Sequence, residues 1–456
     1  MDKSERLGKQ SIPRLLLNLS LPSIMGMLAV TLYHVADTVF VGRGVGMLAI
    51  AAVSVSMPFL MTITIFGQAI GMGGASIVSR ALGAGDKEKA SLTLNNLVHT
   101  ISIINLLTIV AAFIFIEPLL ILFGASEEYL RLAVQYTEIA LIGSFFMNFI
   151  NVTMNAVRAE GNAKFAMQVM IIGAVLNLIV DPIFIFVFEW GIQGAALATV
   201  LSQMTGAVMA MYYYFSGRGV LKMSIPGIIK RPDLSILKES FGIGSASFAR
   251  QAASTLIVIL INHSLLKYGG AVAVATFGVI FRLLMFNFMP LFGINQGFMP
   301  IAGYNYGAGN YQRVRHVVRA GIRATTGFSI VSFLIFFFLS NELISVFSED
   351  PTLVETGTHA LRILVITLPI IGFQIIGSGF YQAMGKILPS LFLGLSRQVL
   401  FLIPFIIVLP LHFGLEGIWY SFPAADFLAG IVTAFMIRHE MRKLKKEIKV
   451  RPVEQE

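Results

Sequence analysis

The feature that most constrains this chain is a series of twelve apolar runs, each long enough to cross a bilayer. A helix needs about 20 residues to span roughly 30 Å of hydrocarbon. Lipid offers no partner for open backbone, so each crossing segment should be helical. Only 12% of the 456 residues are charged, against about 25% in a typical soluble domain. The sequence therefore predicts an all-α membrane protein with twelve transmembrane helices. The runs occupy residues 14–40, 51–79, 91–116, 129–156, 165–188, 192–215, 236–263, 271–300, 317–340, 353–382, 388–411 and 415–437.

The loops between these runs differ in charge on the two sides. The odd-numbered loops hold only Arg43 and Lys267 as basic residues and are otherwise acidic. The even-numbered loops and both ends of the chain are rich in Lys and Arg. Because positive loops stay on the cytoplasmic side, both termini should be cytoplasmic, in the plasma (inner) membrane.

The chain repeats itself with a shift of about 224 residues. Leu82–Asp86 (LGAGD) matches Tyr306–Asn310 (YGAGN), and Gly191–Gly194 matches Gly414–Gly417. Parallel repeats predict two pseudo-symmetric six-helix lobes that work by alternating access. The expected domains are an N-lobe at 1–216, a cytoplasmic linker at 217–233, a C-lobe at 234–440 and a basic tail at 441–456.

Several function classes are excluded by what the sequence lacks. There is no cysteine, which removes disulfides, thiolate metal sites and cysteine nucleophiles. The net charge of +9 comes from basic residues in short loops, as membrane topology requires, so it does not indicate nucleic acid. No phosphate-binding loop or catalytic arrangement is present. The sequence predicts a non-enzyme without a cofactor, whose transport is driven by an Na⁺ or H⁺ gradient.

One polar group stands out inside the fifth apolar run. Asn177 and Asp181 are four residues apart, so they share one face of a helix. Pro182 has no N–H, and the carbonyl of Leu178 therefore loses its usual partner. Such oxygen-bearing groups suit a hard cation or a proton, and a charge at the centre of a membrane helix is usually functional. The alternative is a carboxylate hydrogen-bonded for packing alone.

Asp37 in the first run and Thr199 in the sixth should lie at a depth similar to that of Asp181, given about 1.5 Å of rise per residue. Shifted by 223 or 224 residues, Asn177, Asp181 and Thr199 correspond to three phenylalanines: Phe401, Phe405 and Phe422. A set needed for folding should persist in both halves, so this asymmetry indicates a site. Two alternatives stay open: Asp37 as a residue wetted from outside, and Thr199 as a helix-packing hydroxyl.

These features resemble the multidrug and toxic compound extrusion (MATE) transporters, and look closest to the prokaryotic DinF-like branch. The resemblance covers nearly the whole chain. It rests on two repeated six-helix halves, Pro22 with Asp37 fifteen residues on, the Asn177-x-x-x-Asp181-Pro182 segment and the Gly-Ala-Gly-Asp/Asn loops.

The resemblance implies specific roles. It implies a cation or proton site in the N-lobe made of Asp37, Asn177, Asp181 and Thr199, which would bind Na⁺ if transport is Na⁺-coupled. Tyr136 is similar to a tyrosine near that site, and Pro22 to a proline at which the first helix bends. The NorM-like branch instead uses acidic residues in its C-lobe, where this chain has Arg250, Gln251 and Gln374. Arg250, Gln251, Arg282 and Gln374 are candidates for a substrate cavity, and if Arg250 and Arg282 face it, its wall is basic. Arg397 and Asp426 are expected to form a structural ion pair.

The function expected is secondary-active antiport, in which Na⁺ or H⁺ enters and lipophilic, charged small molecules leave. The partners expected are those solutes and the lipid bilayer, with no nucleic acid and a monomeric state. One alternative is a flippase for lipid-linked oligosaccharides of the same superfamily. Another is a membrane scaffold or receptor that transports nothing.

Overall fold

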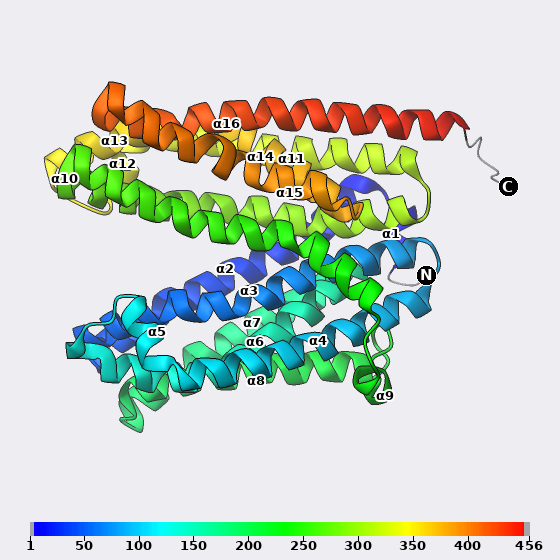
Figure 1. Ribbon diagram of the computed structural model, residues 1–456, viewed down its shortest axis with the longest axis horizontal. Coiled ribbons are helices and arrows are strands. Elements are labelled where there is room, and N and C mark those ends of the chain that lie inside the picture. The colour runs from blue at the N-terminus through cyan, green and yellow to red at the C-terminus, as the bar shows by residue number, and fades with distance from the viewer. Residues whose placement is uncertain (1–3, 451–456) are drawn as a thin grey trace. The chain divides into compact units, whose positions relative to one another are not determined.

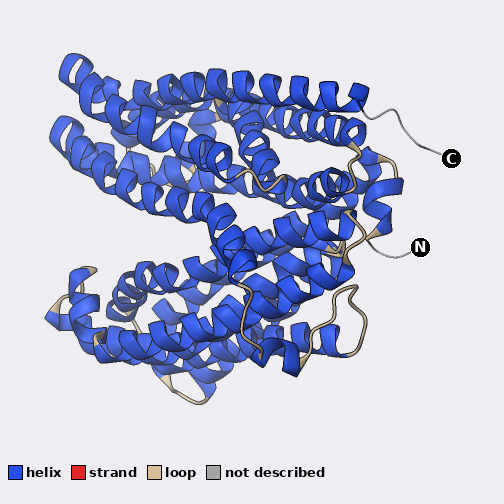
Figure 2. Cartoon of the chain, turned by 45° about the vertical axis from the view of Figure 1, so that its right-hand side comes forward, coloured by secondary structure: helices blue, strands red, loops and turns tan. Residues whose placement is uncertain are grey.

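The computed structural model describes residues 4–450, and every regular element in that range is helical (Figure 2). The helices are α1 (Glu5–Lys9), α2 (Ile12–Gly44), α3 (Met47–Gly83), α4 (Lys87–Ile114), α5 (Ile116–Leu122), α6 (Glu127–Ala159), α7 (Ala163–Pro182), η1 (Ile183–Val187), α8 (Gly191–Phe215), α9 (Ile225–Ile229), α10 (Leu234–Gly307), α11 (Tyr311–Phe338), α12 (Ser340–Ser345), α13 (Pro351–Val365), α14 (Leu368–Ala383), α15 (Ile387–Leu395), η2 (Ser396–Leu402) and α16 (Ile403–Val450). The elements η1 and η2 are π-helical. Residues 451–456 of the predicted basic tail lie outside the described range.

The number of membrane crossings agrees with the sequence. Within the described residues, nine helices are long and apolar enough to span a bilayer. The pair α13 and α14, bent by 48°, adds a tenth. Two of the nine each contain a turn, at Gly270 in α10 and at Gly414 in α16, and so count as two legs. The prediction of a twelve-helix, all-α membrane protein is confirmed.

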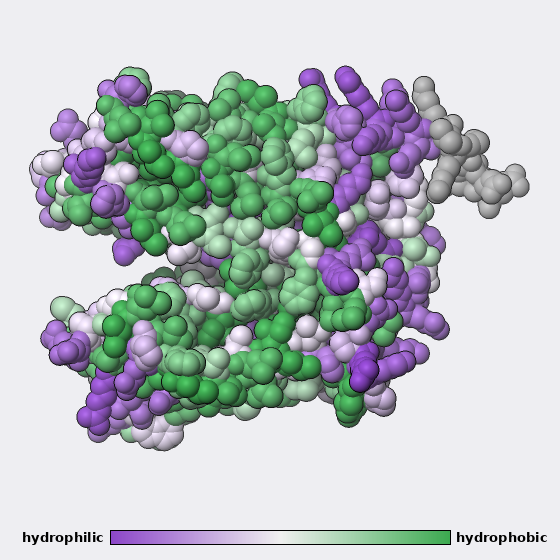
Figure 3. Space-filling view, in the orientation of Figure 1, coloured by the Kyte–Doolittle hydropathy of each residue, from purple (hydrophilic) through white to green (hydrophobic). Residues whose placement is uncertain are grey.

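The chain forms two compact units. The first comprises Met1–Leu7 and Leu21–Gly244, and the second Gly8–Ser20 and Ser245–Glu456. In Figure 1 the first unit runs from blue to green and contains most of α2 through α9; the second contains most of α10 and everything that follows. On the face shown in Figure 3, hydrophobic side chains cover the middle of each unit and hydrophilic ones gather at the helix ends. The division falls inside three helices, α1, α2 and α10, rather than in the predicted linker.

The repeated sequence segments have repeated backbone geometry. Four pairs of glycines separated by 223 or 224 residues take positive φ angles: Gly46 and Gly270, Gly85 and Gly309, Gly161 and Gly385, and Gly191 and Gly414. L-residues rarely adopt this conformation, so each pair ends or turns a helix where a side chain would strain the backbone. In both Gly-Ala-Gly loops the next residue caps the following helix. The side chain of Asp86 accepts from the Lys89 N–H, and that of Asn310 from the Arg313 N–H.

The segment predicted as a cytoplasmic linker is hydrogen-bonded to the first unit. The Asn95 amide of α4 donates to the Lys222 carbonyl at 3.0 Å and accepts from the Ser224 N–H at 3.1 Å. The fully buried Glu160 accepts from the Val220 N–H at 2.8 Å and from the Tyr213 hydroxyl at 3.2 Å.

The start of α10 also packs against the first unit. A Cβ atom on Gly73 would lie 2.0 Å from the Ser240 carbonyl oxygen, and one on Gly244 would lie 2.3 Å from that of Ala69. Only glycines permit so close an approach of two helix backbones. The chain from residue 217 to residue 244 therefore belongs structurally to the first unit.

Candidate functional site

The predicted polar group lies at the end of α7. Asn177 and Asp181 are both buried, with exposed fractions of 1% and 0%. Directly after Pro182, which α7 includes as its last residue, the chain changes from an α-helix to the π-helix η1. A proline cannot supply the hydrogen bond that continues the α-helical pattern, and single π-turns are frequent at functional sites.

Asp37 of α2 lies next to Asp181. Asp37 is 4% exposed, and the two carboxyl groups are close enough for their charges to interact. Apart from each other, Asp37 Oδ1 and both carboxyl oxygens of Asp181 have no hydrogen-bond partner. Tyr136 of α6 is buried and near both carboxylates, and Tyr33 is near Asp37. Neither carboxylate forms an ion pair with a Lys, Arg or His among residues 4–450.

Thr199 joins this group from α8. The Asn177 amide donates to the Thr199 hydroxyl at 3.3 Å. The four predicted site residues therefore come from three helices of the first unit and lie near one another. Two carboxylates, an amide and a hydroxyl supply oxygen ligands only, which suits a proton or a hard cation such as Na⁺. The described residues contain no cluster of three or more His, Cys, Asp or Glu of the kind that holds a transition metal.

The corresponding positions of the second unit are apolar. Phe401, Phe405 and Phe422 are partly buried and pack against the hydrophobic core of that unit. The core includes Trp419 and Ile406, which are almost fully buried. Aromatic rings in that environment supply no ligand for an ion, so the acidic site has no counterpart at these positions.

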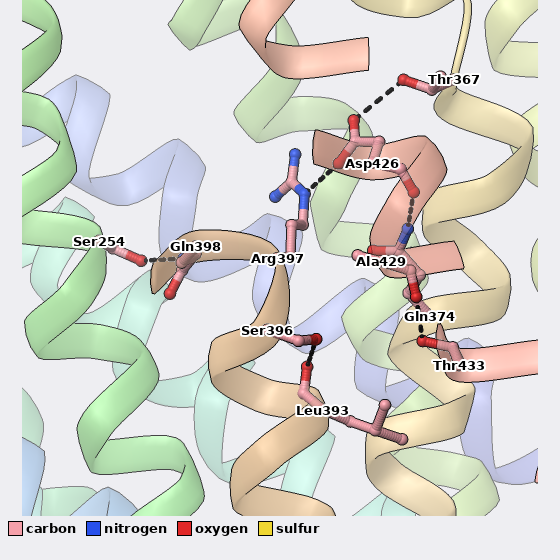
Figure 4. A network of polar contacts seen from close by, with 10 residues as sticks. All are labelled: Ser254, Thr367, Gln374, Leu393, Ser396, Arg397, Gln398, Asp426, Ala429 and Thr433. Carbon is pink, nitrogen blue, oxygen red and sulfur yellow. Dashed lines mark hydrogen bonds and ion pairs between the residues drawn. The ribbon is translucent and has the colours of Figure 1, made fainter. Parts of the chain in front are cut away.

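The second unit has a different polar network, shown in Figure 4. Arg397, in the π-helix η2, forms an ion pair with Asp426 of α16. The Thr367 hydroxyl donates to the other Asp426 carboxylate oxygen at 3.0 Å, and the Gln374 amide donates to the Asp426 carbonyl at 2.6 Å. Asp426 is 1% exposed, so the carboxylate is buried with its countercharge. The predicted pairing of Arg397 with Asp426 is confirmed.

The residues suggested for a substrate cavity do not all lie together. Gln374 belongs to the Asp426 network. Arg282 and Gln251 are exposed on α10. Arg250 is half-buried and donates to the Ser247 hydroxyl at 3.3 Å. Pro22 lies inside α2, which continues through it without a break.

Sequence reasoning did not find the contacts around Arg250 or the buried Glu160. Glu160 lies in a loop between two spans, where a carboxylate is normally solvated. Its only signal in the sequence is the departure from the repeat, since the equivalent position is Met384.

Known proteins are similar over nearly the whole chain. Multidrug export protein MepA of Staphylococcus aureus (strain MRSA252) is 26% identical over 429 residues, 94% of each chain. A solved structure described as MATE in the bent conformation is 27% identical, has a TM-score of 0.91 and matches over 98% of this chain and 99% of its own. Another, described as MATE in the straight conformation, is also 27% identical and has a TM-score of 0.90. The match covers 97% of this chain and 98% of that structure's chain.

A family model agrees with these similarities and with the resemblance found in the sequence. The MatE model matches residues 22–183 and 246–408, which is one match in each half and well over half of the length. Members of this family are membrane transporters rather than enzymes. The chain belongs to the MATE (MatE) transporter family.

Proposed function

We propose that this protein is a multidrug exporter that couples the outward movement of lipophilic organic solutes to the inward movement of Na⁺ or H⁺. The similarity to multidrug export protein MepA supports the export of drug-like solutes. The observation that carries the coupling is the pair of buried carboxylates, Asp37 and Asp181, which interact with each other and have no ion-pair partner in the described chain.

The chemistry of this pair explains why it would bind an ion. Two carboxylates close together in a medium of low dielectric constant repel each other when both are charged. The repulsion falls when a proton neutralises one of them or when a cation lies between them. Asn177 and Thr199 would complete the set of oxygen ligands for Na⁺, and Tyr136 would close one side of the site. The same arrangement can accept a proton, so the donor set fits both ions.

Coupling requires that the bound ion and the exported solute favour different conformations. An ion can shift an equilibrium only by the difference between its affinities for the two states. We propose that α2 bends at Pro22, where the chain lacks one helical hydrogen bond, when Asp37 is neutralised. Solved structures of similar proteins in bent and straight conformations support two states. The bend would change the wall of the solute-binding cavity and release the solute.

The expected surroundings follow from the sequence. The basic even-numbered loops and termini support a plasma-membrane protein with both termini in the cytoplasm. Residue depth along the helices supports a site in the outer part of the membrane, which ions would enter from outside. The name of the relatives does not favour the flippase alternative, since MepA is a multidrug export protein.

The test is transport by the purified protein in sealed vesicles. Efflux of a cationic xanthene dye, rhodamine 6G, is followed under an imposed Na⁺ gradient and, separately, under an imposed pH gradient. Efflux driven by one of the gradients supports the proposal and identifies the ion. If neither gradient drives efflux from vesicles that contain folded protein, the proposal is wrong.

A further inference from the structure

Arg250 is a cation without a countercharge in the middle of a membrane-spanning helix. It lies sixteen residues from the start of α10 at Leu234 and twenty residues before the turn at Gly270. An arginine at the centre of a transmembrane helix costs about 2.5–3.5 kcal/mol on insertion scales, and such residues usually face a partner or a water-filled space. No Asp or Glu among residues 4–450 forms an ion pair with Arg250.

The contacts of Arg250 use only a small part of its hydrogen-bonding capacity. A guanidinium has five N–H donors and no acceptor. One Nη2 donor of Arg250 reaches the Ser247 hydroxyl at 3.3 Å, and this is the only side-chain hydrogen bond of Arg250 within the described residues. The side chain is half-buried rather than sealed, so the remaining donors are available. Arginine presents these donors as a planar fork that matches carboxylate, sulfonate and phosphate groups.

Neighbouring side chains add further donors on α14. The Gln382 amide donates to the same Ser247 hydroxyl at 3.3 Å, which places it beside Arg250. Ser378, one helical turn before Gln382, is 6% exposed, and its hydroxyl has no hydrogen-bond partner. A Cβ atom on Gly394 would lie 3.5 Å from the Ala246 carbonyl and 3.9 Å from the Ser378 hydroxyl, so Ser378 is next to the same stretch of α10.

Another arginine inside an apolar run of this unit, Arg397, shows how the chain neutralises a structural arginine. Arg397 is neutralised by Asp426, which is held in turn by Thr367. Packing alone would favour a similar carboxylate for Arg250, because an uncompensated charge in a low-dielectric region is destabilising. The chain instead surrounds Arg250 with neutral hydroxyl and amide groups and provides no anion of its own.

We infer that Arg250, with Ser247, Ser378 and Gln382, binds the anionic group of an amphipathic ligand: a carboxylate, sulfonate or phosphate attached to an apolar body. Two sources supply such a group, an exported solute and an anionic lipid headgroup. As a site for a solute, the inference rests on the proposed export function, and it extends the range of substrates from cations to anions and zwitterions.

The experiment measures equilibrium binding, which requires no gradient. Purified protein in nanodiscs of phosphatidylcholine is titrated with fluorescein, a dianion at neutral pH, and with rhodamine 6G, a cation on the same xanthene ring system. Fluorescence polarisation reports binding. The variants are Arg250→Gln, which removes the charge, and Arg250→Lys, which keeps it. Arg362→Gln is the matched control, because Arg362 also bonds a serine hydroxyl, that of Ser340, yet is exposed.

Fluorescein affinity should fall about tenfold or more in Arg250→Gln, since a charge-assisted hydrogen bond is lost. It should recover largely in Arg250→Lys and stay unchanged in Arg362→Gln, while rhodamine 6G affinity stays within about twofold in all variants. The inference is overturned if Arg250→Gln loses affinity for both dyes equally, or if it loses affinity for neither. Binding that is intact without any gradient-driven efflux would refute the proposed function and leave the anion site standing.

A second arm identifies the source of the anion. Native mass spectrometry compares bound phosphatidylglycerol in wild type and Arg250→Gln after reconstitution with one-third phosphatidylglycerol. Three results together would show that the site takes a headgroup: wild type retains this lipid, Arg250→Gln does not, and added phosphatidylglycerol lowers the affinity of wild type for fluorescein. If fluorescein binds without lipid retention, the site takes a solute. The absence of both kinds of binding to Arg250 overturns the inference.

Discussion

The two polar centres of this protein solve the same electrostatic problem in opposite ways. Asp37 and Asp181 in the first unit are buried next to each other without any countercharge. Asp426 in the second unit is equally buried but is neutralised by Arg397. Both centres lie beside a π-helical turn, η1 in the first unit and η2 in the second. The two turns are not equivalent positions of the repeat, because a shift of 224 residues carries η1 to residues 407–411, inside α16.

The difference suggests how one half of a repeated fold can become responsive while the other stays fixed. A carboxylate paired with an arginine of its own chain has no need of a proton or metal ion, so its charge state should stay constant during transport. Two carboxylates without a partner must obtain positive charge from solution. The predictions below test this comparison, from the largest expected effect to the smallest.

The largest effect is expected for Asp37→Asn and Asp181→Asn. Each variant keeps the shape of the side chain and removes the charge, so the ion can no longer change the state of the site. Gradient-driven efflux of rhodamine 6G should fall to the level of vesicles without protein, while equilibrium binding of the dye and the melting temperature stay near those of wild type. Full efflux by both variants would place the coupling site elsewhere and remove the basis of the comparison.

The ion pair of Arg397 and Asp426 is tested by Arg397→Gln, which leaves Asp426 buried without a countercharge. Breaking a buried ion pair by removing one partner typically costs about 3–5 kcal/mol, so thermal unfolding in detergent should occur at a clearly lower temperature. The double variant Arg397→Gln with Asp426→Asn replaces the pair by two neutral amides and should recover most of this loss. A single variant as stable as wild type would mean that the pair is not structural.

Glu160 is a further buried carboxylate, outside the membrane-spanning segments, and here stability rather than transport should respond to pH. Burial raises the pKa of Glu160 to about 7, despite the hydrogen bonds from Val220 and Tyr213, which favour the charged form. Because the folded state holds the proton more tightly than the unfolded chain, stability should be highest below about pH 4.5 and fall as the pH rises to about 7. The difference is on the order of 3 kcal/mol. Melting temperatures measured from pH 5 to pH 8 should decline in wild type.

The matched variant for that measurement is Glu160→Gln. Its amide oxygen can still accept from the Val220 N–H, but it does not titrate. Its melting temperature should therefore vary less over the same pH range and exceed that of wild type at pH 8. Identical pH profiles for both proteins would show that other groups control the effect.

Replacing the neutral residues beside Asp37 and Asp181 should reduce ion affinity by smaller amounts, more at Asn177 than at Thr199. Asn177→Ala removes one ligand and should weaken ion affinity about tenfold, a typical loss when a supporting group at an ion site is removed. Thr199→Val removes one neutral hydroxyl, worth about 0.5–1.5 kcal/mol, so a few-fold loss is expected. The ion concentration that gives half-maximal efflux measures the loss of ion affinity in each of the two variants. A larger effect of Thr199→Val would reverse the assumed ranking.

The smallest effect is expected at the aromatic counterparts. Phe405→Leu in the second unit exchanges one apolar group for another of nearly similar volume and should cost about 1 kcal/mol of stability or less. Transport per folded molecule should stay unchanged. Loss of efflux at normal protein levels, as large as that of Asp181→Asn, would show that the two halves are not functionally asymmetric at these positions.

Much of the fold could be predicted from the sequence, because hydrophobic length, the glycines of repeated turns and loop charge are local signals. The shared face of Asn177 and Asp181 is also local, since a spacing of four residues fixes it on a helix. The proximity of Asp37 to Asp181 and that of Gln382 to Arg250 depend on how separate helices pack, and the sequence could at most suggest them. The docking of the linker on Glu160 and Asn95 was not foreseen, because a polar, basic segment is typically solvated.

The anchoring of residues 217–244 to the first unit has a mechanical consequence. The long polar segment between the halves is held by Asn95 and Glu160. It is therefore fixed to the first unit and does not act as a hinge between the units. The chain passes from one unit to the other at Leu7–Gly8, at Ser20–Leu21 and at Gly244–Ser245, each time inside a helix. The crossing at Ser20–Leu21 is directly beside Pro22, which lies inside α2 and cannot donate a helical hydrogen bond. A movement of α2 caused by a change at Asp37 would thus be transmitted along this one helix to Ser20–Leu21, where the helix passes from one unit to the other.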